Sequence, residues 1–160
     1  MAATDVLPLL HSWPAFDRNK RFDLGHDFNW PESLTLDLSA GQEALVRQGI
    51  GTWECELSNN ALTWSDSVFD MFGLPKNKPA ARKITVALYR ESSRVKMERL
   101  RAYAIKHHRG FTLDAEIVPA NGGHRWIRLI AAPVSIDDRT VRLQGFKIDI
   151  THEYRLLIRS

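Results

Sequence analysis

Three consecutive strand-like segments near the end of the sequence constrain how its layers can stack. Phe111–Val118 alternates between apolar and polar residues, which is typical of an edge strand with one face in solvent. His124–Ile136 is apolar on both faces, and Arg139–Ile150 carries apolar residues on each of its faces. A sheet centre that is apolar on both sides has to be covered on both sides. The fold therefore needs a layer on each face of its sheet.

Two turn sequences join these segments into an antiparallel meander. Asn121-Gly122 is a strong hairpin signal, and Asp137-Asp138 separates the second and third strands. Strand alternation then divides the apolar residues between two faces. One face is expected to carry Ile127, Leu129, Ala131, Val141 and Leu143, and the other Trp126, Ile130, Ala132, Val134, Phe146, Ile148 and Ile150.

The stretch before this meander predicts a short hairpin that leads into a helix. Strands over 50–57 and 61–64 flank the Asn59-Asn60 turn. Ser65 is expected to cap the helix that follows, and Gly73 to end it. This region supplies the opening of the domain.

Two further helices are expected before the meander. A short one is predicted near Val86–Tyr89 within a loop region. A longer one opens at Ser92 or Ser93, continues to about His108 and ends at Gly110. Together with the helix after Ser65, these helices would cover one face of the sheet.

The N-terminal segment is a candidate for the second layer. Residues 1–38 form an extension that contains too many aromatic residues for a solvated tail, namely Trp13, Phe16, Phe22, Phe28 and Trp30. We expect part of it to pack on its own domain or on a second chain. Ser39 and Gln42 fit a capping box, which predicts a flanking helix over 39–48 that ends at Gly49.

Composition bounds the class of protein. A hydrophobic content of 44% in 160 residues suits one domain with extensions. The sequence has neither a membrane-spanning apolar run nor a secretory signal pattern, so a soluble cytoplasmic protein is expected. Seven Lys/Arg and two Glu lie between Arg90 and Arg109. We interpret them as a solvated helix face rather than a nucleic-acid site, because no nucleic-acid-binding motif accompanies them.

The order of these elements and a set of short motifs resemble the PAS family, in its branch with a Gly-x-x-Trp opening and a C-terminal Asp-Ile-Thr. The third strand from the end departs from the family, because it has Asp114-Ala115-Glu116 where Glu-aromatic-Arg is common. The residues that carry the resemblance are Gly51, Trp53, Trp64-Ser65, Phe72-Gly73, Phe111, Asn121-Gly122, Arg125-Trp126-Ile127, Gly145 and Asp149-Ile150-Thr151.

The resemblance implies an α+β fold with a five-stranded antiparallel sheet, helices on one face and the N-terminal extension or helix on or near the other. The PAS domain would span 49–152, and 153–160 would be a tail or the start of a linker helix. PAS domains are usually input modules of histidine kinases, cyclic-di-nucleotide enzymes or transcription factors. We expect a stand-alone regulator, with a fragment of a longer receptor as the alternative.

The leading hypothesis for function is signal transduction by protein–protein contact through the apolar outer face. The chain would form a homodimer, contact a histidine kinase or a similar effector, or do both. The residues expected at this interface are Leu45, Val46, Trp126, Ile130, Val134, Phe146, Ile148 and Ile150.

The alternative is a small-molecule sensor with an unidentified ligand between the helices and the sheet. Lys147 is its most informative residue, because alternation points it toward the helices, where a lysine must pair with a carboxylate, bind an anion or lower its pKa. It could instead extend to the rim near Asp149 or Glu54. The expected pocket residues are Phe69, Phe72, Leu100, Tyr103, Ala104, Leu113, Ile127, Leu129, Ala131 and Lys147.

No cofactor, metal site or catalytic activity is predicted. Cys55 lies in the first expected strand, outside the helical Asn-Cys-Arg motif of flavin photoreceptors, and Ile117, Ile127 and Lys147 replace the amides that hold a flavin there. His107 and His108 lie at the basic end of a helix, where a capping role is expected instead of a haem ligand. No arrangement of nucleophile and base or of paired carboxylates is present, so the chain is not expected to be an enzyme.

Overall fold

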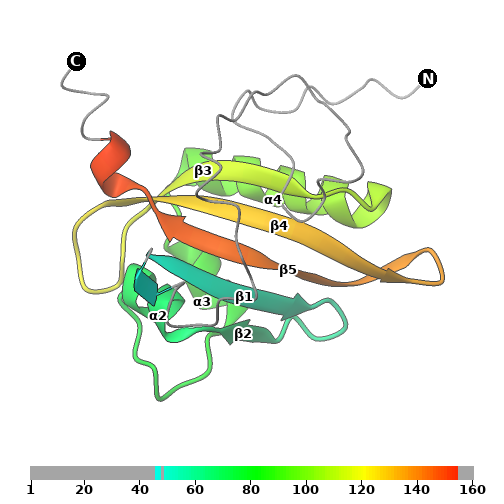
Figure 1. Ribbon diagram of the computed structural model, residues 1–160, viewed down its shortest axis with the longest axis horizontal. Coiled ribbons are helices and arrows are strands. Elements are labelled where there is room, and N and C mark those ends of the chain that lie inside the picture. Colours follow the sequence, from blue (N-terminus) through cyan, green and yellow to red (C-terminus); the bar gives the residue numbers. More distant parts are fainter. Residues whose placement is uncertain (1–45, 48, 155–160) are drawn as a thin grey trace.

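The structure is a computed structural model that describes residues 46–47 and 49–154. Its centre is a five-stranded antiparallel sheet in the order β2-β1-β5-β4-β3 (Figure 1). The strands are β1 (Ile50–Glu56), β2 (Leu62–Trp64), β3 (Phe111–Ile117), β4 (Arg125–Ile136) and β5 (Arg139–Asp149). The last strand of the chain is therefore the middle strand of the sheet.

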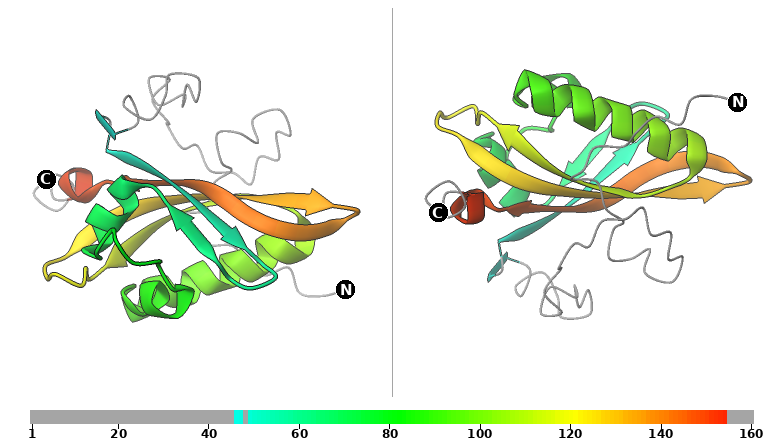
Figure 2. Two further views of the ribbon diagram at one scale, coloured as in Figure 1. Left: turned by 90° about the horizontal axis from the view of Figure 1, so that it is seen from below. Right: turned by 90° about the horizontal axis from the view of Figure 1, so that it is seen from above.

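Three helices lie on one face of this sheet (Figure 2). They are α2 (Asp66–Phe72), α3 (Arg82–Ala87) and α4 (Glu91–His107). The predicted α+β class and the five-stranded antiparallel sheet are thereby confirmed. None of the helices within the described ranges is both long and apolar enough to cross a membrane.

The turns follow the prediction closely in one hairpin and loosely in the other. Asp137 and Asp138 form a two-residue turn between β4 and β5, both with positive φ of 51° and 60°. Asn121-Gly122 lies inside a longer connection, in which the Gly122 amide donates to the carbonyl of Pro119 at 2.9 Å. Asn121-Gly122 therefore turns the chain without closing a tight hairpin.

One predicted cap and one predicted helix start need correction. Ser65 is the residue before α2, but its hydroxyl makes no capping bond. It accepts a hydrogen bond from the Thr52 amide at 2.9 Å, which ties α2 to β1. Similarly, α4 starts one to two residues before the predicted serines, and the Ser93 hydroxyl accepts from the Glu116 amide of β3 at 2.9 Å. Both serines bind a strand because the helices lie directly on the sheet.

The other helix ends are displaced by a few residues. α3 begins at Arg82, four residues before the predicted start at Val86. α4 is ended by His108 in the left-handed conformation, with φ 55°, rather than by Gly110. The His108 ring lies 2.9 Å from both the Ser135 and Thr140 hydroxyls. A polar ring with such partners takes the left-handed C-cap position that glycine commonly fills.

Buried residues form separate clusters on the two faces of the sheet, as the apolar pattern predicts. The inner cluster joins the sheet to the helices and includes Trp53, Phe72, Leu100, Leu113 and Ile127. The outer cluster consists of residues that are between 0 and 7% exposed, namely Ile50, Ile130, Phe146, Ile148 and Ile150. The predicted flanking layer over residues 1–45 lies outside the described residues.

The polar face of β3 is buried, which corrects the expectation of a solvated edge. Asp114 is only 5% exposed and accepts two hydrogen bonds from Arg128 on β4, at 2.8 and 3.0 Å. The Tyr154 hydroxyl donates a third, at 3.0 Å. A buried carboxylate requires such a set of partners. Here they come from the next strand and from the helical turn over residues 151–154, called the C-terminal turn below.

Replacing Asp114 by Asn should lower the free energy of unfolding by about 3 kcal/mol, because it removes the negative charge that compensates the nearly buried Arg128. Asp70→Asn is the matched control, since the Asp70–Lys76 ion pair is exposed and its loss should change stability by less than about 1 kcal/mol. Urea unfolding of the three proteins measures both values. Equal stability of the two variants would contradict the structural role of Asp114.

Candidate functional site

Lys147 lies in the middle of β5, opposite Gly51 of β1 and Leu129 of β4. Its side chain points to the helical side, as predicted, and the residue is only 6% exposed. Aromatic rings surround its ammonium group. The distances from Nζ to the ring centroids are 4.7 Å for Phe72, 5.0 Å for Trp64, 5.5 Å for Trp53 and 6.0 Å for Tyr89.

These rings attract a cation but do not replace the water that Lys147 has lost. A buried cation–π contact contributes about 2 kcal/mol, and aromatic rings offer no strong hydrogen-bond acceptor. Desolvation lowers the pKa of Lys147 from 10.5 to about 7. The ammonium makes no hydrogen bond or ion pair with the part of the chain that the structure describes. Extension of the side chain to the rim near Asp149 or Glu54 is therefore excluded.

A cavity of about 50 Å³ lies beside Lys147, between the sheet and the helices α3 and α4. Most of its wall is apolar, and the only charged residues among its described lining are cationic. Its partly exposed lining residues mark the open side and come from β2, α3 and α4: Leu62, Arg82, Val86 and Arg101. The remaining lining residues are buried: Trp53, Cys55, Thr85, Tyr89, Met97, Phe111, Leu129, Leu143 and Lys147.

The predicted pocket and the observed cavity share only Leu129 and Lys147. Tyr103 is partly exposed and packs on His107, with 4.4 Å between ring centroids. The other predicted pocket residues belong to the inner core, namely Phe69, Phe72, Leu100, Ala104, Leu113, Ile127 and Ala131. The sequence analysis missed the contribution of α3, because that helix was placed too late in the chain and has no clear apolar period.

Trp53 is a buried lining residue of the cavity, and its indole lies across the neighbouring strand β5 at Gly145. Its indole Nε1 donates to the carbonyls of Ile130 and Phe146, at 3.2 and 3.3 Å. Gly145 is directly opposite Trp53 in the β1–β5 register. A Cβ at position 145 would lie 1.9 Å from the Ile130 carbonyl oxygen. This backbone contact requires glycine, and the same bare position leaves room for the indole.

The outer face brings together five of the predicted interface residues. Trp126 packs against the outer cluster that contains Ile130, Phe146, Ile148 and Ile150. Val134 lies farther along β4, next to an irregularity in its pairing with β5, and is not part of this cluster. Val46 is 58% exposed, and Leu45 lies outside the described residues.

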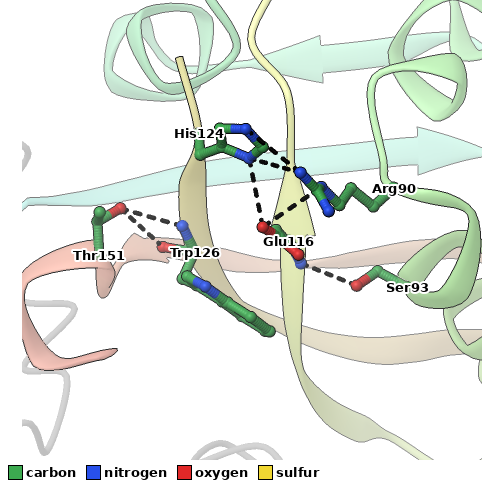
Figure 3. Close-up of polar contacts among 6 residues, drawn as sticks. All are labelled: Arg90, Ser93, Glu116, His124, Trp126 and Thr151. Carbon is green, nitrogen blue, oxygen red and sulfur yellow. Dashed lines mark hydrogen bonds and ion pairs between the residues drawn. The ribbon is translucent and has the colours of Figure 1, made fainter. Parts of the chain in front are cut away.

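The C-terminal turn is fixed to the same end of the sheet (Figure 3). The Thr151 hydroxyl accepts from the Trp126 amide at 3.0 Å and donates to Asp149 at 2.6 Å. Asp149 also binds Arg125 at 2.8 Å. The Tyr154 ring stacks on Trp126, with 4.1 Å between centroids and planes 6° apart. The Asp-Ile-Thr segment thus joins the last strand to the outer face.

A second group of charges lies near this end, along the edge of β3 and beside the start of α4 (Figure 3). Glu116 is 3.4 Å from Arg90 and 3.3 Å from His124. All three side chains are at least 22% exposed. Exposed ion pairs of this kind contribute little to stability. We assign this cluster a surface role.

The residues around the cavity do not suit haem or flavin. The described lining contains no histidine, asparagine or glutamine. His107 and His108 are exposed, and His108 is the C-cap of α4. Cys55 is in strand β1. Within the described ranges, no group of three metal-ligating side chains is present.

The burial of Lys147 predicts a specific pH dependence of stability. The unfolded chain keeps this proton up to its ordinary pKa of 10.5, whereas the folded protein releases it above about pH 7. Between these values the unfolded state binds more protons, so the contribution of Lys147 to stability rises with pH, by about 1.4 kcal/mol per pH unit.

Replacement by Met, which keeps the length and removes the charge, should abolish this contribution. The difference in unfolding free energy between wild type and Lys147→Met should therefore change by that slope across the interval. Lys106→Met, on the exposed end of α4, is the control and should keep the wild-type slope. Parallel pH profiles for wild type and Lys147→Met would refute a lowered pKa.

Comparisons with known proteins agree on the fold. No family model matches the sequence. The sensor protein FixL of Bradyrhizobium diazoefficiens is 26% identical over 106 residues, which are 66% of this chain and 21% of FixL. The chain thus spans about a fifth of the length of this relative.

Two solved structures resemble the domain closely in shape. The sensory box histidine kinase/response regulator of Burkholderia thailandensis superposes with a TM-score of 0.64 and 17% identity, over 74% of this chain and 89% of that one. The N-terminal domain of a Marinobacter aquaeolei diguanylate cyclase with PAS/PAC sensor gives 0.60 and 16%, over 66% and 98%. One motif of the resemblance needs correction: the family opening was given as Gly-x-x-Trp, but this chain has a single residue between Gly51 and Trp53. The described residues have the PAS fold.

Proposed function

We propose that this chain is a signal-transduction module that acts by protein–protein contact through the outer face of its sheet and its C-terminal turn. The observation that carries the proposal is the connection between these two features. Tyr154 stacks on Trp126 of the outer face and donates to Asp114, while Thr151 binds the Trp126 backbone. A change at this face would therefore alter the position of the residues that leave the domain.

The outer cluster has the composition of a contact surface. Its members are large and apolar and come from β4, from β5 and the residue after it, and from β1, which contributes Ile50. Interface cores are similarly apolar and enriched in aromatic residues. The relatives with sensor and histidine-kinase names support a signalling partner of that class. We propose a homodimer as the basic assembly, and a kinase or a similar effector as the protein it regulates.

Ligand sensing is a second candidate, favoured by the cavity beside the buried Lys147. The two functions are compatible, because β5 contributes to both faces. Lys147 lines the cavity, and its neighbours Phe146 and Ile148 belong to the outer cluster. A ligand that changes the position of Lys147 would act directly on the proposed contact strand.

Ile148→Asp tests the contact surface. Ile148 is an apolar residue of the outer cluster and is 7% exposed, so a carboxylate there should weaken association at least about tenfold and also lower the stability of a domain that still folds. The matched control is Ile84→Asp on α3, where the isoleucine is 56% exposed on the helical side and association should not change. Analytical ultracentrifugation gives the association constant, and circular dichroism monitors the fold. Unfolding of Ile148→Asp, with no folded monomer, would show that this face is core rather than interface.

A further inference from the structure

We propose that the cavity beside Lys147 binds one small monoanion, such as a carboxylate of one to three carbons. This inference rests on the ligand-sensing candidate and defines the chemical class of its ligand. It does not depend on the contact surface, so each proposal can fail without the other.

The charges around the cavity favour an anion. Lys147, Arg82 and Arg101 line it, and its described lining includes no Asp or Glu. Arg82 binds Glu98, and Arg101 donates to Asn60 at 3.2 Å. The two arginines at the open side thus have partners, whereas the buried lysine has only aromatic rings. An anion entering from that side would pass Arg101 and the Arg82–Glu98 pair before it reached Lys147.

The donors in the wall also lack acceptors. Tyr89 lines the cavity and is 5% exposed, and its hydroxyl makes no hydrogen bond with the described part of the chain. Burial raises the pKa of Tyr89, so the hydroxyl remains a donor at neutral pH. Lys147 adds a second donor without an acceptor. Neither donor atom is among the fully buried polar atoms left without a partner in the described part of the chain, so each keeps some accessible surface, and one bound oxyanion would accept from both.

Size and polarity narrow the ligand further. A cavity of about 50 Å³ suits a ligand of a few non-hydrogen atoms better than a ring cofactor or a long-chain acid. Phe111, Leu129 and Leu143 form apolar walls, where the attraction between an anion and the ammonium is stronger than in water. One or two oxygens on a short apolar body match this combination of walls and donors.

Anion binding should be linked to protonation of Lys147. The ligand pairs with the charged ammonium, which is present below the lowered pKa of about 7. Affinity should therefore fall about tenfold per pH unit above that value. The other titratable or charged groups that face Lys147 are Cys55 on β1, Tyr89 after α3, and Arg82 and Arg101 on the helices. Both arginines keep their charge over this range, so the lysine sets the slope.

Sodium acetate is the probe, and acetamide is its neutral isostere. NMR of the Lys147 side chain, with the Cε carbon labelled, reports binding and protonation at the site itself. Sodium gluconate holds the ionic strength constant, because its anion is too large for the cavity. Acetate should give a saturable shift at pH 6, with an affinity that falls about tenfold from pH 7.5 to pH 8.5. Acetamide should give none.

Variants distinguish acetate binding at Lys147 from nonspecific attraction to exposed positive charges. Lys147→Met should abolish acetate binding, followed for all variants through backbone amide shifts around the cavity. Lys147→Gln serves the same purpose if the Met variant does not fold. Lys106→Met removes an exposed charge of the same type and should bind acetate as the wild type does.

Three results would overturn the proposal: no saturable acetate shift in the wild type, equal binding of acetamide, or acetate binding retained without Lys147. The association constant of the unliganded protein is measured separately. A normal association constant together with absent acetate binding would reject the anion site and leave the contact surface standing.

Discussion

Burial of the central strand on both of its faces is the constraint on which the other features depend. β5 lies between β1 and β4 and has the helices on one side and the outer cluster on the other. From position 145 to position 148 its residues alternate between two buried faces. Gly145 shows how tight this arrangement is, because its missing side chain admits both the Ile130 carbonyl and the Trp53 ring. Lys147 is buried because it occupies the next inward position of the same strand.

Asp114 and Lys147 are both buried in the sheet, but their charges are compensated in different ways. Asp114 has its compensation built into the chain, from a bidentate arginine and a tyrosine hydroxyl. Lys147 has only aromatic rings, which are too weak to offset desolvation, so its pKa falls to about 7. A fold that needed a charge at this position only for stability would lose nothing by an apolar side chain there. The lysine is therefore better explained by what it binds than by what it holds together.

Alternation in the sequence predicts the meander, its two apolar faces and the inward direction of Lys147, whereas the single five-stranded sheet came from the resemblance to PAS domains. Local patterns could not show which distant groups meet. Asp114 was expected in solvent because its partner Tyr154 lies 40 residues away in sequence. The cavity wall was missed for a similar reason, since α3 has no apolar period and its Arg82 and Thr85 line the site through tertiary packing. Periodicity predicts which face a residue occupies, whereas the partners on that face depend on the whole fold.

Strand β5 connects the proposed anion site with the proposed contact surface. Lys147 pairs with Leu129 in the β4–β5 register, and the adjacent pair joins Ile148 to Arg128, which holds Asp114. Lys147, where the anion would bind, and Ile148 of the outer cluster are thus consecutive residues of β5. The C-terminal turn is bound to Trp126 by Thr151 and Tyr154, so it would follow such a shift. An anion bound in the cavity would then change the position of residues 151–154 without a hinge motion or a rearranged helix.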